Sequence, residues 1–357
     1  MTSATIHAPA AAGRPSDLAV SLKQNSGVVA AVLLFLALWI FYNLFHPKGF
    51  SSQVMVQNAN EAFSLALVAM AQTLPVLAGG LDLSVGAVMT LVDCVASHVL
   101  MGSPLQIVFG IVVCLLTGAA AGFVNGLVVV YGRIQPIIAT LATGAVYIGL
   151  ALFLRPEPGG EVSEDLNWAL TNAVPDLAET FGWGTGGVWD YFGWLPVPIV
   201  LLLLIVLLVW VPFRRSVTGR AVYAIGSAEG AAYMSGLNLN RAKIAAFTLA
   251  GFLSGCAGLF LAIQTASGNA DIPQAGAYTL NSIAAVVIGG TSLLGGSGSA
   301  IGSIFGAFVL RVISFNFRIF DVDPLLQPLI EGIILLVAVS LGAFRVLRVK
   351  NTLELFR

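Results

Sequence analysis

The sequence predicts an all-α integral membrane protein with about ten transmembrane helices, some of them broken or re-entrant, and both termini in the cytoplasm. Composition is the first reason, because 58% of the 357 residues are hydrophobic and only 9% are charged, against roughly a quarter in an ordinary soluble domain. The second reason is a series of apolar runs of membrane-spanning length, and the third is the distribution of Lys and Arg. These features exclude a soluble globular protein.

Ten apolar stretches follow one another along the chain. Residues 1–25 are small and polar, and they lead into a run too long for the core of a cleaved signal peptide, so we expect a disordered cytoplasmic tail followed by an uncleaved span. The segments 83–101 and 277–291 are the weakest, and we expect broken or re-entrant helices there. Within a transmembrane domain of residues 26–343, the expected spans are 27–45, 57–80, 83–101, 105–131, 135–154, 195–213, 243–265, 277–291, 297–320 and 325–343.

Lys and Arg determine the predicted orientation, because these residues are retained on the cytoplasmic side. With the N-terminus inside, three of the 16 lie outside, namely Lys48, Arg155 and Arg318, and Arg311 lies within a span. The opposite orientation would invert this bias. Twelve lie inside: Arg14, Lys23, Arg133, Arg214, Arg215, Arg220, Arg241, Lys243, Arg345, Arg348, Lys350 and Arg357. Residues 344–357 then form a second cytoplasmic tail.

One long loop, residues 155–194, is predicted on the extracytoplasmic side. It holds seven of the 17 acidic residues and four of the six Trp residues. Aromatic side chains beside acidic ones suit a protein-docking surface, and an interfacial aromatic belt is the alternative. The docking candidates are Trp168, Trp183, Trp189 and Trp194.

A second long loop, residues 214–242, is predicted inside. We expect Ser227 to cap a short helix, Glu229 to complement its positive end, and Gly236 to end it. An ordered helix beside cationic residues such as Arg241 is a surface that a cytoplasmic motor could contact. The alternative is an amphipathic helix on the lipid surface, although its small residues bury little apolar area.

Four motifs carry a resemblance to a known family: GGLDLSVG at 79–86, IATLATG at 138–144, the segment 219–243 that ends in AIGSAEGAAYMSGLNLNRAK, and IAAVVIGGTSLLGGSGSAIG at 283–302. With them, nearly all the chain after residue 50 resembles the membrane subunits of bacterial ABC importers of the ribose and simple-sugar type. That binding-protein-dependent permease family also contains branched-chain amino acid members.

The resemblance implies a multi-pass protein of the bacterial inner membrane that works with several partners. These are a second permease copy or paralogue, ABC ATPase subunits that bind ATP and Mg, a periplasmic sugar-binding protein, and membrane lipid. The inner loop would couple to the ATPase through Gly226, Ser227, Glu229, Ser235, Gly236, Leu237, Asn238 and Arg241. Tyr233 stands where a basic residue is common, Ala142 stands where Gly is common, and the outer loop is long for the family. The first departure bears on which ATPase would match this chain. The other two bear on which substrate and which binding protein would.

An internal echo supports a transporter independently of the resemblance. GGLDLSVG at 79–86 and GGTSLLGG at 289–296 agree at four of eight positions, with Gly79 opposite Gly289. Paired Gly-interrupted segments often mark helix breaks near a transport pathway. Chance agreement in a Gly-rich protein is the alternative.

Polar residues within the spans are candidates for the translocation pathway, because polar groups at membrane depth require a partner or a water-filled cavity. Hydrogen bonding between helices is the alternative for each of them. The candidates are Gln57, Glu61, Gln72, Asp82, Thr90, Asp93, Ser97 and Asn281.

The predicted function is sugar transport without an ATPase site in this chain. No G-x-x-x-x-G-K-[ST] phosphate loop occurs, so we expect no cofactor here. The Gln, Asn, Ser and Thr inventory suits a monosaccharide or polyol, with nucleosides and branched-chain amino acids as alternatives. An ion-coupled secondary transporter would use Glu61, Asp93 or Glu331.

Three scattered His and three separated Cys predict neither an enzyme nor a metal site, and a net charge of -1 predicts no nucleic-acid partner.

Overall fold

A computed structural model describes residues 25–184 and 186–326, followed by the short pieces 329–330, 332–334, 336–337 and 340. The predicted tails 1–25 and 344–357 lie outside these residues, apart from Asn25, and so does much of the predicted tenth span, 325–343. Within the described part the chain forms helices and, apart from two isolated bridges, no β-structure. The all-helical prediction is therefore confirmed, whereas the number ten stays a prediction.

Seven of the described helices are long and apolar enough to cross a membrane. Each coincides with a predicted span to within a few residues, because a long apolar run sets the length of a membrane helix. They are α2 (Ser26–Phe45), α3 (Ser52–Leu77), α5 (Pro104–Tyr131), α6 (Pro136–Leu154), the helix Val197–Arg215, α12 (Leu239–Thr265) and α14 (Ala300–Ile319). The fifth comprises α9 (Val197–Ile205), a π-helical turn η2 (Val206–Trp210) and α10 (Val211–Arg215).

Two helices are too short to span alone, and they are those at the two weak segments. α4 (Val85–Val99) has 15 residues and α13 (Ile272–Ile288) has 17. At about 1.5 Å per residue they reach roughly 22 and 26 Å, less than the about 30 Å of a hydrocarbon core. A Gly-containing loop precedes α4 and another follows α13, but each helix is itself continuous, so broken or re-entrant spans at these segments stay a prediction.

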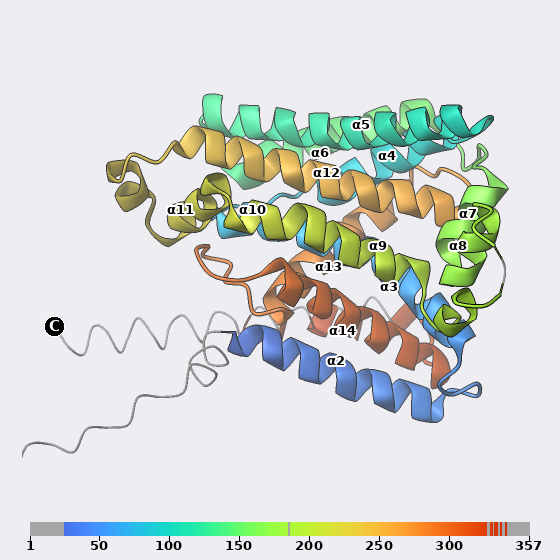
Figure 1. The fold of residues 1–357 in the computed structure, drawn as a ribbon. Coiled ribbons are helices and arrows are strands. Elements are labelled where there is room, and N and C mark those ends of the chain that lie inside the picture. Colours follow the sequence, from blue (N-terminus) through green and yellow to red (C-terminus); the bar gives the residue numbers. More distant parts are fainter. Residues whose placement is uncertain are drawn as a thin grey trace, which may run out of the picture.

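α3 is the central helix of the bundle, and 89% of the residues in its most apolar 18-residue stretch are buried. α12 packs against α3, α4 and α5, and α14 packs against α2, α3 and α13 (Figure 1). Small residues allow the closest of these contacts. A Cβ atom at Gly122 of α5 would lie 2.2 Å from the carbonyl oxygen of Phe247 in α12, so only Gly permits this approach.

The two long loops lie at opposite ends of the bundle (Figure 1). One end carries α7 (Glu164–Thr171), α8 (Val174–Thr180) and the 3-10 turn η1 (Trp189–Phe192), and the other carries α11 (Val217–Met234). We call them the α7–α8 end and the α11 end. Their opposition agrees with the sequence prediction, while the assignment of each end to a side of the membrane stays a prediction. Residues 155–194 are more ordered than a plain loop, because Ser163 caps α7 and Asp176 accepts a hydrogen bond from Ala173 N–H (3.1 Å) at the start of α8.

Candidate functional site: the α11 end and the polar groups of the bundle

α11 is a bent element at its own end of the bundle (Figure 1). Ser216 caps its start, and Ala228 has an extended backbone (φ -163°, ψ 93°), so the helix divides into two pieces at this residue. Gly236 has φ +76°. Its N–H donates to Tyr233 O (3.0 Å) and that of Leu237 donates to Ala232 O (3.3 Å). This glycine cap confirms the predicted end of the helix.

The prediction that Ser227 caps the second piece is wrong. The Ser227 hydroxyl donates back to Tyr223 O (2.9 Å) and lies 3.5 Å from Gly296 O. The preceding turn and a neighbouring loop therefore engage this hydroxyl, and the extended residue is Ala228, one position later. Glu229 follows the bend and pairs with Lys243 of α12 at 2.6 Å, so it ties α11 to α12.

The remaining residues predicted to couple to an ATPase surround the end of α11. The Ser235 hydroxyl donates to Ala231 O (2.9 Å), and the Asn238 side chain caps α12 by accepting from Arg241 N–H (2.9 Å). Glu229, Ser235, Gly236, Asn238 and Arg241 are exposed, and Leu237 is half-buried. Tyr233 and Met234 are large hydrophobic residues at this end that are also exposed, to 69% and 84%.

Gly226 lies where both Gly-rich loops meet α11. A Cβ atom there would lie 2.0 Å from Leu77 O and 2.4 Å from Gly296 N, and Gly295 packs against both Gly226 and Gly79. The Gly296 N–H donates to Leu77 O (3.1 Å). We call Gly79, Gly226, Gly295 and Gly296 the glycine junction. It brings three of the sequence motifs into backbone contact.

The internal echo is present in the structure, but its register differs from the one read from the sequence. α3 and α13 both end in a Gly with φ +80°, at Gly79 and Gly290. In each case this N–H donates three residues back, to Val76 O and Val287 O. Gly79 therefore corresponds to Gly290 rather than to Gly289, because the helix end, and not the count of Gly matches, sets the equivalence.

Asp82 braces the break before α4. Its Oδ1 accepts from the N–H (2.8 Å) and hydroxyl (2.6 Å) of Ser84. The Asn125 amide of α5 donates to the Ser84 hydroxyl (2.7 Å), and the Tyr147 hydroxyl of α6 donates to Asn125 Oδ1 (3.1 Å). Thr140 accepts from Leu83 N–H (2.9 Å). Asp82 therefore closes a local turn with Ser84, and the Ser84 hydroxyl links this turn to α5.

Asp93 and Ser97 tie α4 to neighbouring chain segments. Asp93 Oδ2 accepts from Asn269 N–H (2.8 Å), and the Ser97 hydroxyl accepts from Arg155 Nε (2.8 Å). Thr90 is buried in α4, Asn281 is half-buried in α13, and Gln72 is fully buried in α3. The eight pathway candidates are thus spread over several places. Over the described ranges, no group of three His, Cys, Asp or Glu side chains could hold a metal ion.

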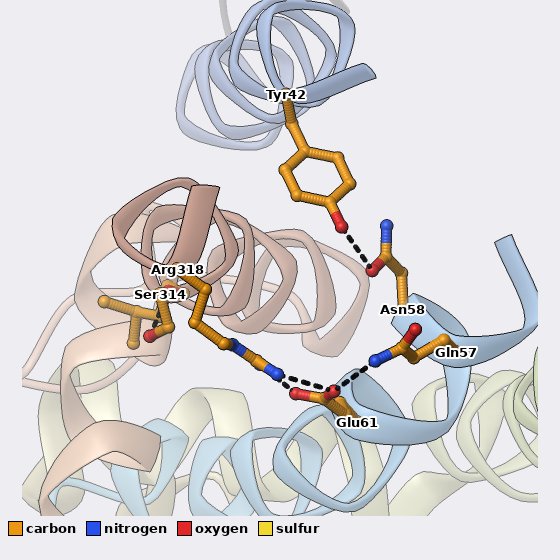
Figure 2. A network of polar contacts seen from close by, with 7 residues as sticks. Tyr42, Gln57, Asn58, Glu61, Ser314 and Arg318 are labelled. Carbon is orange, nitrogen blue, oxygen red and sulfur yellow. Dashed lines mark hydrogen bonds and ion pairs between the residues drawn. The ribbon is translucent and has the colours of Figure 1, made fainter. Parts of the chain in front are cut away.

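Gln57 and Glu61 belong to a polar network at the α7–α8 end, drawn in Figure 2. The Arg318 guanidinium of α14 forms an ion pair with both carboxylate oxygens of Glu61 in α3. Gln57 Nε2 lies 3.5 Å from Glu61 Oε1, and the Tyr42 hydroxyl of α2 donates to Asn58 Oδ1 (3.4 Å). Sequence reasoning missed Tyr42, Asn58 and Arg318 here.

Two features of the sequence could have pointed to Arg318. It is one of only three cations predicted on the extracytoplasmic side, where cations are unfavourable, and Glu61, an acidic residue within a span, needs a partner.

The aromatic residues of the α7–α8 end are mostly exposed: Trp168 to 54%, Trp183 to 60% and Trp194 to 56%. Trp189 is half-buried, and its ring stacks on Trp183 with centroids 6.1 Å apart. The segment is fixed to the bundle, since Asn60 donates to Thr171 O and Ser52 donates to Gly193 O, both at 2.6 Å. It therefore presents these rings on a supported surface.

Comparison with known proteins decides the family. Residues 54–339 match the family described as "Branched-chain amino acid transport system / permease component". The chain belongs to this permease family. No solved structure matches the permease significantly.

Relatives of this permease match along nearly their whole length. The ribose import permease proteins RbsC of Haemophilus influenzae and Bacillus subtilis are 31% and 33% identical to it, over 89% and 88% of this chain and 92% and 93% of theirs. The fructose import permease protein FrcC of Rhizobium meliloti is 31% identical over 90% of this chain and 86% of its own. A probable ABC transporter permease protein of Escherichia coli K12, YphD, is 31% identical over 91% of this chain and 93% of its own.

Proposed function

We propose that the chain is the membrane-spanning permease subunit of an ATP-binding-cassette importer, which translocates a monosaccharide or related polyol delivered by a periplasmic binding protein. One observation carries the proposal: import permeases named for ribose and fructose match this chain over about nine-tenths of its length. Full-length similarity of this kind extends to the helix breaks and to α11, and is not confined to one motif.

The α11 end suits contact with a partner ATPase. The exposed side chains of Tyr233 and Met234 provide apolar anchors, and Arg220 and Arg241 are also exposed in this part of the chain. An interface with buried aromatic or apolar anchors and a charged rim is typical of protein docking. Motion of α11 would reach both Gly-rich loops through Gly226, because its backbone contacts both. ATP and Mg then bind the partner and not this chain.

The α7–α8 end suits contact with a soluble binding protein. Its exposed Trp residues are the kind of anchor that dominates binding energy at interfaces. Acidic residues beside them, including Glu164 and Asp176, would attract a basic rim on the partner. In this proposal the α7–α8 end faces the periplasm, the α11 end and both termini face the cytoplasm, and the protein lies in the bacterial inner membrane as a dimer with a second permease.

Transport by the assembled importer tests the function. The chain, its ATPase and its binding protein are reconstituted in liposomes, and uptake of labelled pentoses, hexoses, polyols, nucleosides and branched-chain amino acids is measured. We expect saturable, ATP-dependent and binding-protein-dependent uptake of a sugar or polyol. Import of only nucleosides or branched-chain amino acids would refute the sugar assignment and leave the permease family intact. Uptake by the chain alone, driven by an ion gradient, would instead indicate a secondary transporter.

A further inference from the structure

A polar cavity lies at the α7–α8 end between α2, α3 and α14, next to the network in Figure 2. Its volume is about 370 Å³, within the range of about 300 to 1,000 Å³ found for small-molecule sites. Gln57, Asn58 and Glu61 of α3 line it, together with Tyr42, Phe315 and Arg318 from the two neighbouring helices. Two of the predicted pathway residues, Gln57 and Glu61, therefore line this cavity.

The cavity is balanced in charge. Its lining holds one carboxylate, Glu61, and one guanidinium, Arg318, and these two form an ion pair. His46, also in the lining, accepts the backbone N–H of Lys48 at its Nδ1 (3.1 Å). An anionic ligand such as a phosphate would need an unpaired cation. A neutral ligand meets no net charge.

The lining nevertheless offers many hydrogen-bonding groups. Asn58 is only 9% exposed, and its Nδ2 has no partner among the described residues. Gln57 is exposed beside it and bonds only weakly to Glu61, at 3.5 Å. A buried amide donor without a partner is costly, and rotation of the Asn58 amide toward the cavity that it lines would let a ligand hydroxyl accept from it. The Phe315 ring adds an apolar surface against which the C–H face of a sugar can pack.

We propose that this cavity is a binding subsite for one neutral monosaccharide, with Gln57, Asn58 and Glu61 as its hydrogen-bonding groups and Arg318 as the residue that positions the Glu61 carboxylate. The inference rests on the proposed function and names a place where the sugar would bind within this chain. A purely structural role of the Glu61–Arg318 pair, as a brace between α3 and α14, accounts for the ion pair but leaves the Asn58 donor unexplained.

Protection of an introduced thiol tests the subsite. Gln57→Cys is made in a Cys256→Ala background, since Cys94 and Cys114 are buried, and the full chain is placed in lipid nanodiscs. The rate of maleimide labelling is measured with D-ribose, D-fructose, D-ribose 5-phosphate or glycerophosphocholine. We expect a neutral sugar to slow labelling, by about tenfold at ten times its Kd. Gln53→Cys, one turn earlier on α3 and outside the lining, is the matched control and should label at one rate throughout.

Several outcomes would overturn the subsite. They are unchanged labelling at position 57 with both sugars, equal slowing at positions 53 and 57, and protection by glycerophosphocholine or the sugar phosphate alone, which would indicate a lipid headgroup or anion site.

A second measurement separates the subsite from the function. In the reconstituted importer, Asn58→Leu should lower sugar uptake while binding-protein-stimulated ATP hydrolysis persists, which also shows that the variant is assembled. Normal uptake by Asn58→Leu would refute the subsite and leave the proposed function standing. An importer that carries no sugar with the unaltered chain would refute the function itself.

Discussion

Individual hydrogen bonds fix the non-helical segment between α3 and α4 of this permease. Between Leu77 and Val85 the chain is not helical, and its polar groups must find partners inside the bundle. Asp82 and Ser84 do so by bonding each other and, through Asn125, the Tyr147 hydroxyl of α6. The break is therefore a defined structure whose stability depends on buried side chains of α5 and α6.

Tyr147→Phe should weaken this arrangement without changing the packing volume much. It removes the donor to Asn125 Oδ1 and Ala121 O, and a buried polar group left without a partner costs about 1 to 3 kcal/mol. We expect the free energy of unfolding, measured by SDS titration in mixed micelles, to fall by that amount. Tyr131→Phe, at an exposed position at the end of α5, is the control and should unfold like the parent. Equal stability of the two variants would contradict the bracing role.

At this scale the sequence predicts which residues are polar within a span, but not the partners they choose. Gln57 and Glu61 are both pathway candidates from the sequence, but Glu61 contacts another helix whereas Gln57 is exposed. Its partner Arg318 is 257 residues away, so no local spacing connects them. Asp93 and Ser97 were predicted for the pathway, yet they bond Asn269 and Arg155 near the α7–α8 end. Which polar residues meet is determined by tertiary packing.

Among the elements, α11 differs most from its prediction. Local rules place a cap at Ser227, whereas the structure bends at Ala228. The rule fails because the Ser227 hydroxyl has two competing carbonyl acceptors, Tyr223 O in the preceding turn and Gly296 O in a distant loop. The end of the element at Gly236 was predictable, since a left-handed C-terminal cap is local and strongly favours Gly.

Gly226→Ala should uncouple α11 from the two Gly-rich loops. The added Cβ would lie 2.0 Å from Leu77 O, a distance at which the backbones must separate. We expect the reconstituted importer to keep its subunit composition but to lose most sugar uptake per ATP hydrolysed. Gly230→Ala, four residues later on α11 with nothing within 4 Å of the added atom, is a matched control and should transport normally. If the two variants behave alike, the glycine junction does not transmit motion.

For the whole molecule, two independent observations, one from the sequence and one from the fold, concern the axis that runs from the α7–α8 end to the α11 end. The Lys and Arg distribution predicts that residues 155–194 and 214–242 lie on opposite sides of a membrane. The fold places α7 and α8 at one end of the bundle and α11 at the other (Figure 1). The spans were predictable because apolar length is a property of the local sequence. The exact equivalence of the two Gly-rich loops was not, because it depends on where α3 and α13 end.

Cysteine labelling in intact cells should establish the orientation. In the Cys256→Ala background, Val188→Cys lies in an exposed part of the α7–α8 end and Gly230→Cys lies on exposed α11. Because cationic residues concentrate near α11, we expect a membrane-impermeant maleimide to label position 188 from outside and position 230 only after the membrane is permeabilised. The two sites serve as controls for each other, since a leaky membrane would label both. The reverse pattern would invert the topology and, with it, the sides assigned to the binding protein and the ATPase. Labelling of both positions from outside in sealed cells would instead mean that the bundle does not span the membrane along this axis.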